Sequence, residues 1–171
     1  MIDSAARTGR DPSLDPPALR VALGGFATGV TIVTCLDPAG ARIGLTVNSF
    51  NALSLEPPMV LWSLRLASPS LGAFDGATHF AINVLAESQV DLSRRFASTV
   101  PAKFDEGLWG QGVCGVPVLA GCAATFECRL ASHQTAGDHR LYFGLVTAMS
   151  TQSVPPLVYH GGRYHMLGEI L

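Results

Sequence analysis

Short apolar runs bounded by turn-forming residues recur along the chain. Three of them, Val30–Cys35, Met59–Leu64 and His79–Leu85, are short and mostly apolar. Runs of this length between Gly, Pro, Asn or Asp residues predict strands. Arg42–Leu55 is predicted to be extended as well, with a break at Asn48–Asn51, where polar residues interrupt the apolar pattern.

The second half of the chain carries the signals of two hairpins. Gly121–Gln134 and His139–Thr147 are predicted to be long strands joined by a four-residue turn. Near the C-terminus, the apolar and aromatic positions on either side of Gly161-Gly162 predict a second, shorter hairpin over residues 157–166. Two glycines suit its turn because glycine tolerates the positive φ that tight hairpin turns need.

Three segments carry helical signals. Asp15 followed by Pro16 and Pro17 is typical of a helix start, and apolar residues recur at helical spacing up to Phe26. Further short helices are predicted to begin at Ser68-Pro69 and end near residue 76, and to run from 87 to about 97. Residues 98–116 are predicted to be irregular.

This pattern favours a mostly β domain. Six or seven predicted strands and three short helices do not alternate regularly, which favours an antiparallel barrel with peripheral helices over a doubly wound sheet. Residues 15–171 are interpreted as one domain. Residues 1–14 are polar and are predicted to be a flexible tail.

Composition narrows the range of functions. The 171 residues are 48% hydrophobic and only 14% charged, which excludes general disorder and indicates apolar surface hidden in a subunit interface or under a flat ligand. Eleven Lys and Arg against thirteen Asp and Glu cannot form the basic face that nucleic acid requires. We expect no membrane span, since there is no stretch of about 20 apolar residues. The N-terminus lacks an apolar signal core, so a cytoplasmic location is expected.

No familiar catalytic or metal-binding motif in the sequence indicates a function. Cys35, Cys114, Cys122 and Cys128 have no CxxC spacing, so we expect reduced cysteines and no metal site. Residues 110–115 match G-x-G-x-x-G but lack the preceding strand and following helix of a dinucleotide fold, and are interpreted as a loop. Without a nucleophile or metal cluster, an enzyme of this sequence would need a cofactor to carry its chemistry.

Three polar segments remain as candidate binding or catalytic sites, and each could instead have a purely structural role. Thr46–Asn51 offers hydroxyls and amides that could bind phosphate or polyol oxygens, or form only a polar bulge. Gly137-Asp138-His139 could present an imidazole oriented by its neighbouring carboxylate, or form only a turn. The aromatic residues of Tyr159–His165 could stack on a planar ligand or pair across the hairpin.

The order of several short motifs resembles the flavin reductase family with the split-barrel fold. The matching segments are Phe26–Thr34, Gly44–Phe50, Ser54–Pro58, Phe80–Leu85, Gly137–His139 and Pro156–Tyr159. The resemblance extends from about residue 18 to 168. It implies a homodimeric, FMN-binding split β-barrel, antiparallel with Greek-key topology, which uses NADH or NADPH to reduce FMN or FAD. It also implies a separate flavin-dependent monooxygenase as the partner that receives the reduced flavin.

The resemblance also implies a set of site residues. The segment after Phe50, Asn51-Ala52-Leu53, departs from the usual pattern and bears on the choice between FMN and FAD. On the flavin side the resemblance gives Thr28, Thr46, Asn48, Ser49, Phe50 and Ser63 in the groove, Arg65 and Ser68 near the phosphate, and Phe80, Ala81, Ile82 and Asn83 beside the ring edge. On the nicotinamide side it gives His139 as the catalytic-site histidine that orients the dinucleotide, with Tyr159, Arg163 and Tyr164 close by.

Two other functions stay open at this point. A barrel of this kind could carry or sense flavin or haem without turnover, or could be an oxidase of the pyridoxamine-phosphate type. The segments around Gly137–His139 and Tyr159 favour a reductase, because a carrier has no use for a nicotinamide site.

Overall fold

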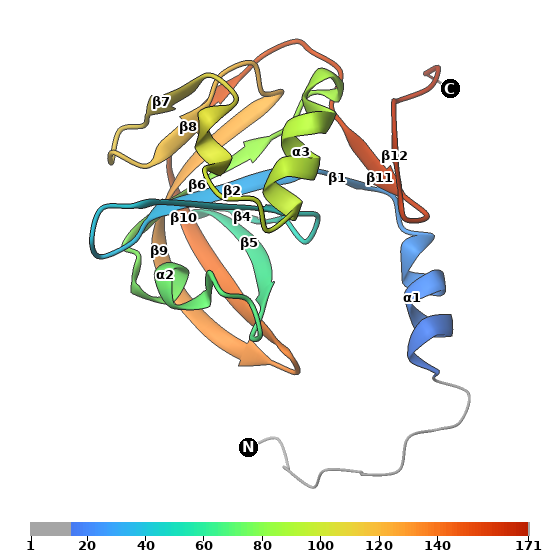
Figure 1. Cartoon of the computed structure of the whole chain (residues 1–171), viewed down its shortest axis with the longest axis horizontal. Coiled ribbons are helices and arrows are strands. Elements are labelled where there is room, and N and C mark those ends of the chain that lie inside the picture. The colour runs from blue at the N-terminus through green and yellow to red at the C-terminus, as the bar shows by residue number, and fades with distance from the viewer. Residues whose placement is uncertain (1–14, 171) are drawn as a thin grey trace, which may run out of the picture.

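The computed structural model describes residues 15–170 as a mostly β domain (Figure 1). The expected tail, residues 1–14, lies outside the described residues. The helices are α1 (Pro16–Gly24), α2 (Leu71–Gly76) and α3 (Val90–Ala97), and single 3₁₀ turns cover Glu87–Gln89 and Lys103–Asp105. Asp15 caps α1 as predicted, because its carboxylate accepts a hydrogen bond from the Ala18 N–H.

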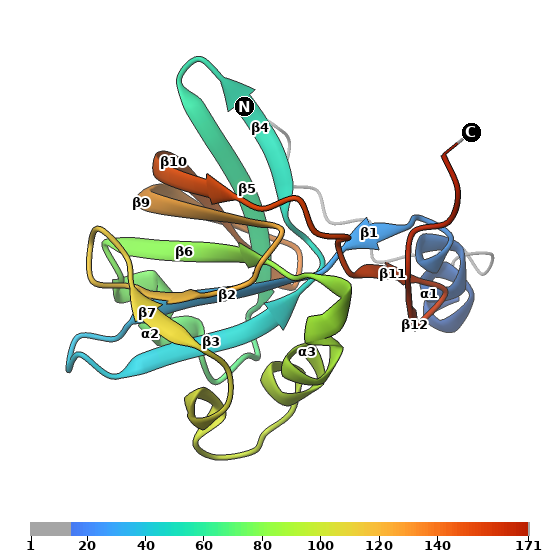
Figure 2. The ribbon, with the colours of Figure 1, turned by 90° about the horizontal axis from the view of Figure 1, so that it is seen from above.

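Seven antiparallel strands form the main sheet, in the order β3-β2-β6-β9-β10-β5-β4. Figure 2 shows that the sheet curls strongly from β4 round to β3. The fold class predicted from the sequence, an antiparallel split barrel with few short helices, is confirmed. These strands are β2 (Thr31–Leu36), β3 (Arg42–Val47), β4 (Asn51–Leu55), β5 (Pro58–Arg65), β6 (His79–Val84), β9 (Ala124–Ala136) and β10 (His139–Thr151).

The curled sheet is joined across its open side by one side chain. No strand pairing is present between β3 and β5 in the described sheet, although the chain crosses from one side to the other between β3 and β4. Ser49, in that crossing, donates its hydroxyl to the Ser63 carbonyl of β5 at 2.9 Å and accepts the Ser63 N–H at 3.0 Å. The Ser49 hydroxyl therefore replaces a strand partner for Ser63.

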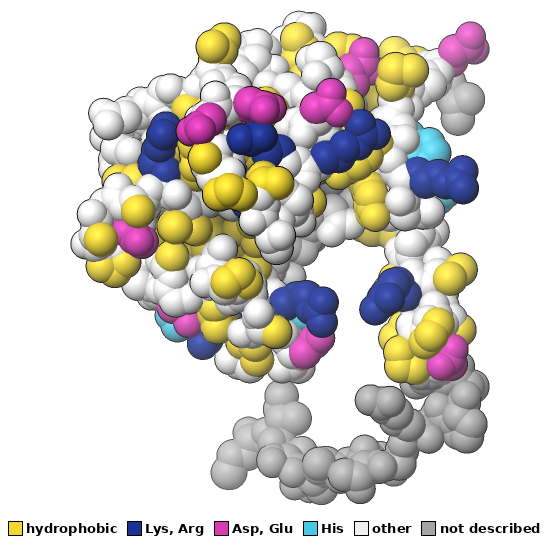
Figure 3. Space-filling view, in the orientation of Figure 1, with side chains coloured by type: hydrophobic (Ala, Val, Ile, Leu, Met, Phe, Trp, Pro, Cys, Tyr) yellow, Lys and Arg dark blue, Asp and Glu magenta, His cyan; other side chains and the backbone are white. Residues whose placement is uncertain are grey.

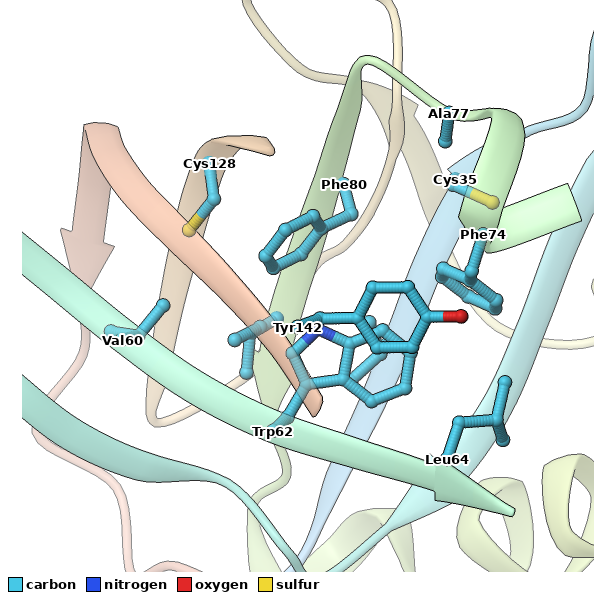
Figure 4. Packing of buried hydrophobic residues seen from close by; sticks show 11 residues of the cluster. Cys35, Val60, Trp62, Leu64, Phe74, Ala77, Phe80, Cys128 and Tyr142 are labelled. Carbon is cyan, nitrogen blue, oxygen red and sulfur yellow. The ribbon is translucent and has the colours of Figure 1, made fainter. Parts of the chain in front are cut away.

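Aromatic side chains fill the inside of the curled sheet (Figure 4). Trp62 and Tyr142 stack with ring centroids 4.5 Å apart, and Phe74 and Phe80 meet the indole edge to face. All four are almost completely buried. The Tyr142 hydroxyl donates to Asp75 of α2 at 2.7 Å, which ties α2 over this end of the core. Burial and the Asp75 carboxylate both raise the pKa of the Tyr142 hydroxyl, so it stays protonated at neutral pH.

A separate part of the structure extends away from the barrel. The strands β1 (Thr28–Gly29), β11 (Val158–His160) and β12 (Arg163–His165) form a small sheet, and the Gly161 N–H donates to the Gly24 carbonyl at the end of α1. Figure 1 shows α1 standing clear of the main sheet beside this hairpin. The hairpin turn at Gly161-Gly162, where both residues have positive φ, is as predicted.

Several sequence predictions need correction. The stretch 98–116, predicted to be irregular, contains β7 (Trp109–Gln111), which pairs with β8 (Pro117–Leu119) through a glycine-containing loop. The G-x-G-x-x-G motif, interpreted from the sequence as a loop, begins inside β7 at Gly110-Gln111, and only residues 112–115 form the loop. β8 follows the motif in place of the helix that a dinucleotide fold requires. The β9–β10 turn is only Gly137-Asp138, because Ala136 still pairs with His139.

The four cysteines divide into two kinds. Cys35, Cys122 and Cys128 are buried thiols, and Cys114 is exposed in the β7–β8 loop. Burial raises the pKa of each buried thiol to about 12. All four are free thiols.

Asn83 connects the β7–β8 hairpin to the barrel. Its side chain is fully buried, donates to the Ile32 carbonyl at 3.0 Å and accepts the Leu119 N–H at 2.9 Å. We expect Asn83→Ala to lower the free energy of unfolding by about 2 kcal/mol, because it leaves buried backbone groups without partners. Urea unfolding measures this change. Asn51→Ala, on the exposed edge strand β4, is the matched control, and equal losses in the two variants would contradict the assignment.

Candidate functional site

A polar groove of about 490 Å³ lies where the sheet is not closed by strand pairing. One wall is the end of β3 and the following turn, the other is the end of β5, and His139 of β10 closes one side. The lining residues are Leu45, Thr46, Val47, Asn48, Ser49, Ser63, Leu64, Arg65, Ala67, Ser68 and His139. Six of the predicted flavin-side residues, Thr46, Asn48, Ser49, Ser63, Arg65 and Ser68, are therefore brought together with His139.

The hydroxyls in this groove are not equally available to a ligand. Thr46 donates its proton to the Ser93 carbonyl at 2.7 Å, and Ser49 donates to Ser63. The Ser68 hydroxyl oxygen accepts the Ser70 N–H at 3.3 Å, which leaves the Ser68 proton free to donate outward. Since phosphate accepts hydrogen bonds, the donors suited to it are Arg65, Ser68 and the Asn48 amide rather than Thr46 and Ser49.

His139 is held by the residue before it. The His139 Nδ1 lies 2.7 Å from the Asp138 carboxylate, in the turn between β9 and β10. This contact favours the proton on Nδ1 and leaves Nε2 as the ring nitrogen available to a ligand. The hydrogen bond from His139 lowers the pKa of the exposed Asp138 carboxyl, which keeps it ionised at neutral pH. The sequence hypothesis of an imidazole oriented by its neighbour agrees with this geometry.

A larger apolar cavity of about 830 Å³ adjoins the polar groove. The two share Asn48, Ser49 and Ser63, and the cavity continues between the barrel and α1. Figure 3 shows this hollow beside the separate column of α1. Thr28 lines the cavity with a buried hydroxyl that finds no hydrogen-bond partner within residues 15–170. A buried hydroxyl without a partner is costly, so it is an expected contact for a ligand atom.

A small tyrosine pocket of about 180 Å³ lies on the other side of the β3 end. Thr46, Val47 and Asn48 form one wall, and Tyr159 and Tyr164 form another. The two tyrosine rings meet edge to face with centroids 5.5 Å apart. The predicted nicotinamide-side residues are thus divided: His139 lies in the polar groove, Tyr164 lies in this pocket, and Tyr159 lines both this pocket and the apolar cavity.

Some predicted site residues are not brought to these cavities. The structure places the Phe50 ring against Phe126, with centroids 5.7 Å apart, toward the barrel core. Arg163 is exposed at the tip of the C-terminal hairpin and lines none of the three cavities. The side chains of Phe80, Ala81, Ile82 and Asn83 are buried because β6 lies in the middle of the sheet, paired on both edges.

Sequence reasoning did not identify the contributions of α1 and Ser93. Arg20, Val21 and Leu23 of α1 line the apolar cavity, and Ser93 of α3 contacts residues on two walls of the tyrosine pocket. The helical spacing in α1 predicted an apolar face but not what it would face. Within residues 15–170, no three His, Cys, Asp or Glu side chains are grouped closely enough to hold a metal ion. None of the helices described is long and apolar enough to cross a membrane.

Comparison with known proteins identifies the family. The model of the flavin reductase like domain matches residues 23–168. The chain belongs to this family. It is 47% identical over 147 residues to the FMN reductase (NADH) SmoA of Agrobacterium fabrum, covering 86% of this chain and 83% of that protein. It is 40% identical over 153 residues to HsaB of Rhodococcus jostii, the reductase subunit of a flavin-dependent monooxygenase, covering 89% and 78%.

Solved structures of family members agree in fold. The NADH:FAD oxidoreductase SgcE6 of Streptomyces globisporus, in complex with NAD and FAD fragments, superposes with a TM-score of 0.86 at 32% identity, covering 92% of this chain and 95% of that one. Relatives differ in length. The chain spans only 48% of one Rhizobium meliloti relative, to which it is 45% identical over 150 residues.

The His139–Asp138 contact predicts a specific titration. We expect His139→Ala to raise the pKa of the Asp138 carboxyl toward its ordinary value, because the largest cause of its lowering is removed. The wild-type contact stabilises the fold above the ordinary carboxyl pKa, and this contribution is lost as pH falls through the lowered value. NMR titration of the carboxyl carbons measures both pKa values. An unchanged Asp138 pKa in His139→Ala would contradict the contact.

Proposed function

We propose that the chain is an NAD(P)H-dependent flavin reductase which takes FMN or FAD and supplies the reduced flavin to a separate monooxygenase. The observation that carries the proposal is the polar groove opening, past Asn48, Ser49 and Ser63, into the apolar cavity. This sequence of surfaces suits a flavin nucleotide, which has a phosphate and polyol at one end and a flat apolar ring system at the other. Family membership and the named activities of the relatives support it.

The residues present fit a flavin nucleotide. Arg65 and Ser68 would hold the phosphate, and the Asn48 amide and Ser63 hydroxyl would contact the polyol. The unpartnered Thr28 hydroxyl would reach a polar atom at the edge of the ring system. When bound, a flavin would accept the hydride of a reduced nicotinamide. No protein side chain can serve as this hydride acceptor.

The protein's contribution is binding and alignment. His139 would present Nε2 to the dinucleotide, while Asp138 holds Nδ1, the other nitrogen of the imidazole ring. Leu61 and Leu141 would give the apolar cavity a surface that excludes water from the reacting rings. Because hydride transfer moves no proton to or from the protein, His139 acts in this proposal as an orienting group rather than as an acid or base.

A carrier or sensor without turnover is the second candidate, and the His139–Asp138 pair is the feature that disfavours it. A carrier needs the phosphate donors and the apolar cavity, but not an oriented imidazole at the rim of the groove. An oxidase of the pyridoxamine-phosphate type is disfavoured by the named activities of the relatives.

A homodimer is part of the proposal. Within the described structure α1 has no buried residue, and its side chains Val21 and Leu23 are 79% and 66% exposed. Phe26, which follows the helix, is 73% exposed. Figure 3 shows apolar side chains gathered on the column that contains α1, which stands apart from the barrel. Their burial in a symmetric interface would remove a large apolar surface from water.

A cytoplasmic location completes the proposal. All four cysteines are free thiols, and one of them is exposed in a loop. Thiols in this state suit a reducing compartment.

The catalytic prediction is tested with NADH and free flavin. We expect NADH absorbance to fall only when FMN or FAD and oxygen are present. We expect His139→Ala to raise the KM for NADH about tenfold, which corresponds to about 1.4 kcal/mol of lost binding, while the Kd for flavin changes less than about twofold. Steady-state kinetics and flavin fluorescence titration give the two values.

The matched control for this variant is His79→Ala, since His79 lies on β6 and lines none of the cavities. It should leave both constants unchanged. Bound flavin without NADH consumption by the wild-type protein would favour the carrier. Equal loss of NADH and flavin binding in His139→Ala would overturn the role given to His139.

The dimer is tested by mass. Analytical ultracentrifugation should give about twice the 18.0 kDa of one chain. Leu23→Asp should shift the protein to the monomer, because it places a charge in the apolar interface, while circular dichroism stays that of the folded barrel. Asp91→Leu, on the exposed side of α3, controls for the effect of a surface substitution. A wild-type monomer with full activity would refute the dimer.

A further inference from the structure

Ser93 touches two walls of the tyrosine pocket without lining it. It lies on α3 and its side chain is fully buried. Its carbonyl accepts the Thr46 hydroxyl at 2.7 Å, and its own hydroxyl lies 2.9 Å from the Tyr164 hydroxyl. Thr46 and Tyr164 both line the pocket, whereas Ser93 stands behind them. One residue therefore fastens the end of β3 and the C-terminal hairpin to the same point of α3.

This double contact matters because the two walls belong to different sheets. Thr46 is on β3 of the main sheet, and Tyr164 is on β12 of the small sheet, 118 positions away by residue number (164 − 46). The small sheet is also attached to the barrel through β1, which leads directly into β2, and just before β11, where the Leu157 N–H donates to the Leu85 carbonyl at 2.8 Å. The Arg94 guanidinium lies 5.7 Å from the Tyr164 ring centre, which adds a weaker contact from the solvent side.

The Tyr164 hydroxyl also orients both tyrosine rings. With its oxygen held by Ser93, the Tyr164 ring is fixed edge to face against Tyr159. Loss of this hydrogen bond would let the phenol turn toward water and would widen the distribution of pocket shapes. Thr46 would keep its contact in that case, because it bonds to the Ser93 backbone and not to the Ser93 hydroxyl.

We propose that Ser93 is a positioning residue which fixes the width of the tyrosine pocket and, through Tyr164, selectively supports binding of the nicotinamide dinucleotide. The proposal rests on the proposed function. Tyr164, which Ser93 holds, lines the tyrosine pocket and neither of the other two cavities. The phosphate donors Arg65 and Ser68 line the polar groove and not the tyrosine pocket, so they do not depend on this hydroxyl. Ser93 therefore supports the affinity for the dinucleotide, through the hairpin, without changing the affinity for flavin, which the polar groove sets.

The test removes the same hydrogen bond from either end. Ser93→Ala and Tyr164→Phe should each raise the KM for NADH about fivefold, the size expected for one hydrogen bond, with kcat and the flavin Kd changed less than about twofold. The double variant should show no further increase, because both substitutions remove one shared interaction. Ser98→Ala is the matched control: its hydroxyl caps the exposed end of the same helix by bonding to the Arg95 carbonyl.

A second readout does not use activity. Amide hydrogen exchange at Tyr164 and His165 in the ligand-free protein should quicken about fivefold in Ser93→Ala and in Tyr164→Phe, and should be unchanged in Ser98→Ala. Should Ser93→Ala fail to fold, Tyr164→Phe tests the same bond from the half-buried hairpin. The kinetic measurements support the proposal only if the KM for NADH rises and the Kd for flavin does not change.

Several outcomes would overturn the proposal. They are additive effects in the double variant, equal weakening of flavin and NADH binding, or an unchanged KM in both single variants. Failure of the proposed function looks different, since the wild-type protein itself would then consume no NADH with added flavin. The exchange measurement would still decide, in that case, whether Ser93 holds the hairpin.

Discussion

The hydrogen bonds between Ser49 and Ser63 determine where this molecule can bind a ligand. A fully paired barrel of this size would have its interior filled by side chains and its edges satisfied by neighbouring strands. Here β3 and β5 approach without pairing, and one hydroxyl serves both backbone groups of Ser63. The opening on either side of this bridge becomes the polar groove and the start of the apolar cavity. The Ser49–Ser63 contact therefore joins the two sides of the curled sheet and leaves space for a ligand on either side of it.

The ligand that the groove can bind depends on which of its hydroxyl groups already donate their protons to hydrogen bonds within the protein. Hydroxyl-rich segments attract attention as binding sites, yet Thr46 and Ser49 donate to backbone carbonyls and can offer a ligand only their lone pairs. The donors left for an anion are the Asn48 amide and, on the β5 side, Arg65 and Ser68. His139, on the neighbouring strand, stands at the same side with its orientation set by Asp138.

Local patterns in the sequence predicted most of the fold. Strand runs, the helix start at Asp15 and the Gly161-Gly162 turn depend on neighbours within a few residues, and each appears in the structure. The β7–β8 hairpin was not predicted, because its three-residue strands carry too little periodic signal and are held by Asn83 from a distant strand.

The site was predictable where one segment carried it and not where distant segments meet. Residues 46–49 and His139 reach the groove as expected. Phe50 follows the polar run but lies against the core, because just before β4 its ring packs against Phe126. The role of Ser93 depends on two partners far away in the chain, and a lone serine inside a helix gives no sign of either.

The distribution of thiols has a practical consequence for studying this protein in solution. Only the thiolate form reacts with electrophiles, and three of the four sulfur atoms are both enclosed and held in the protonated form by burial. Cys114 is left as the single accessible thiol among the four cysteines, in a loop that lines none of the ligand cavities. The native chain thus provides one attachment point for a spectroscopic label, and it can be used without removing any other cysteine.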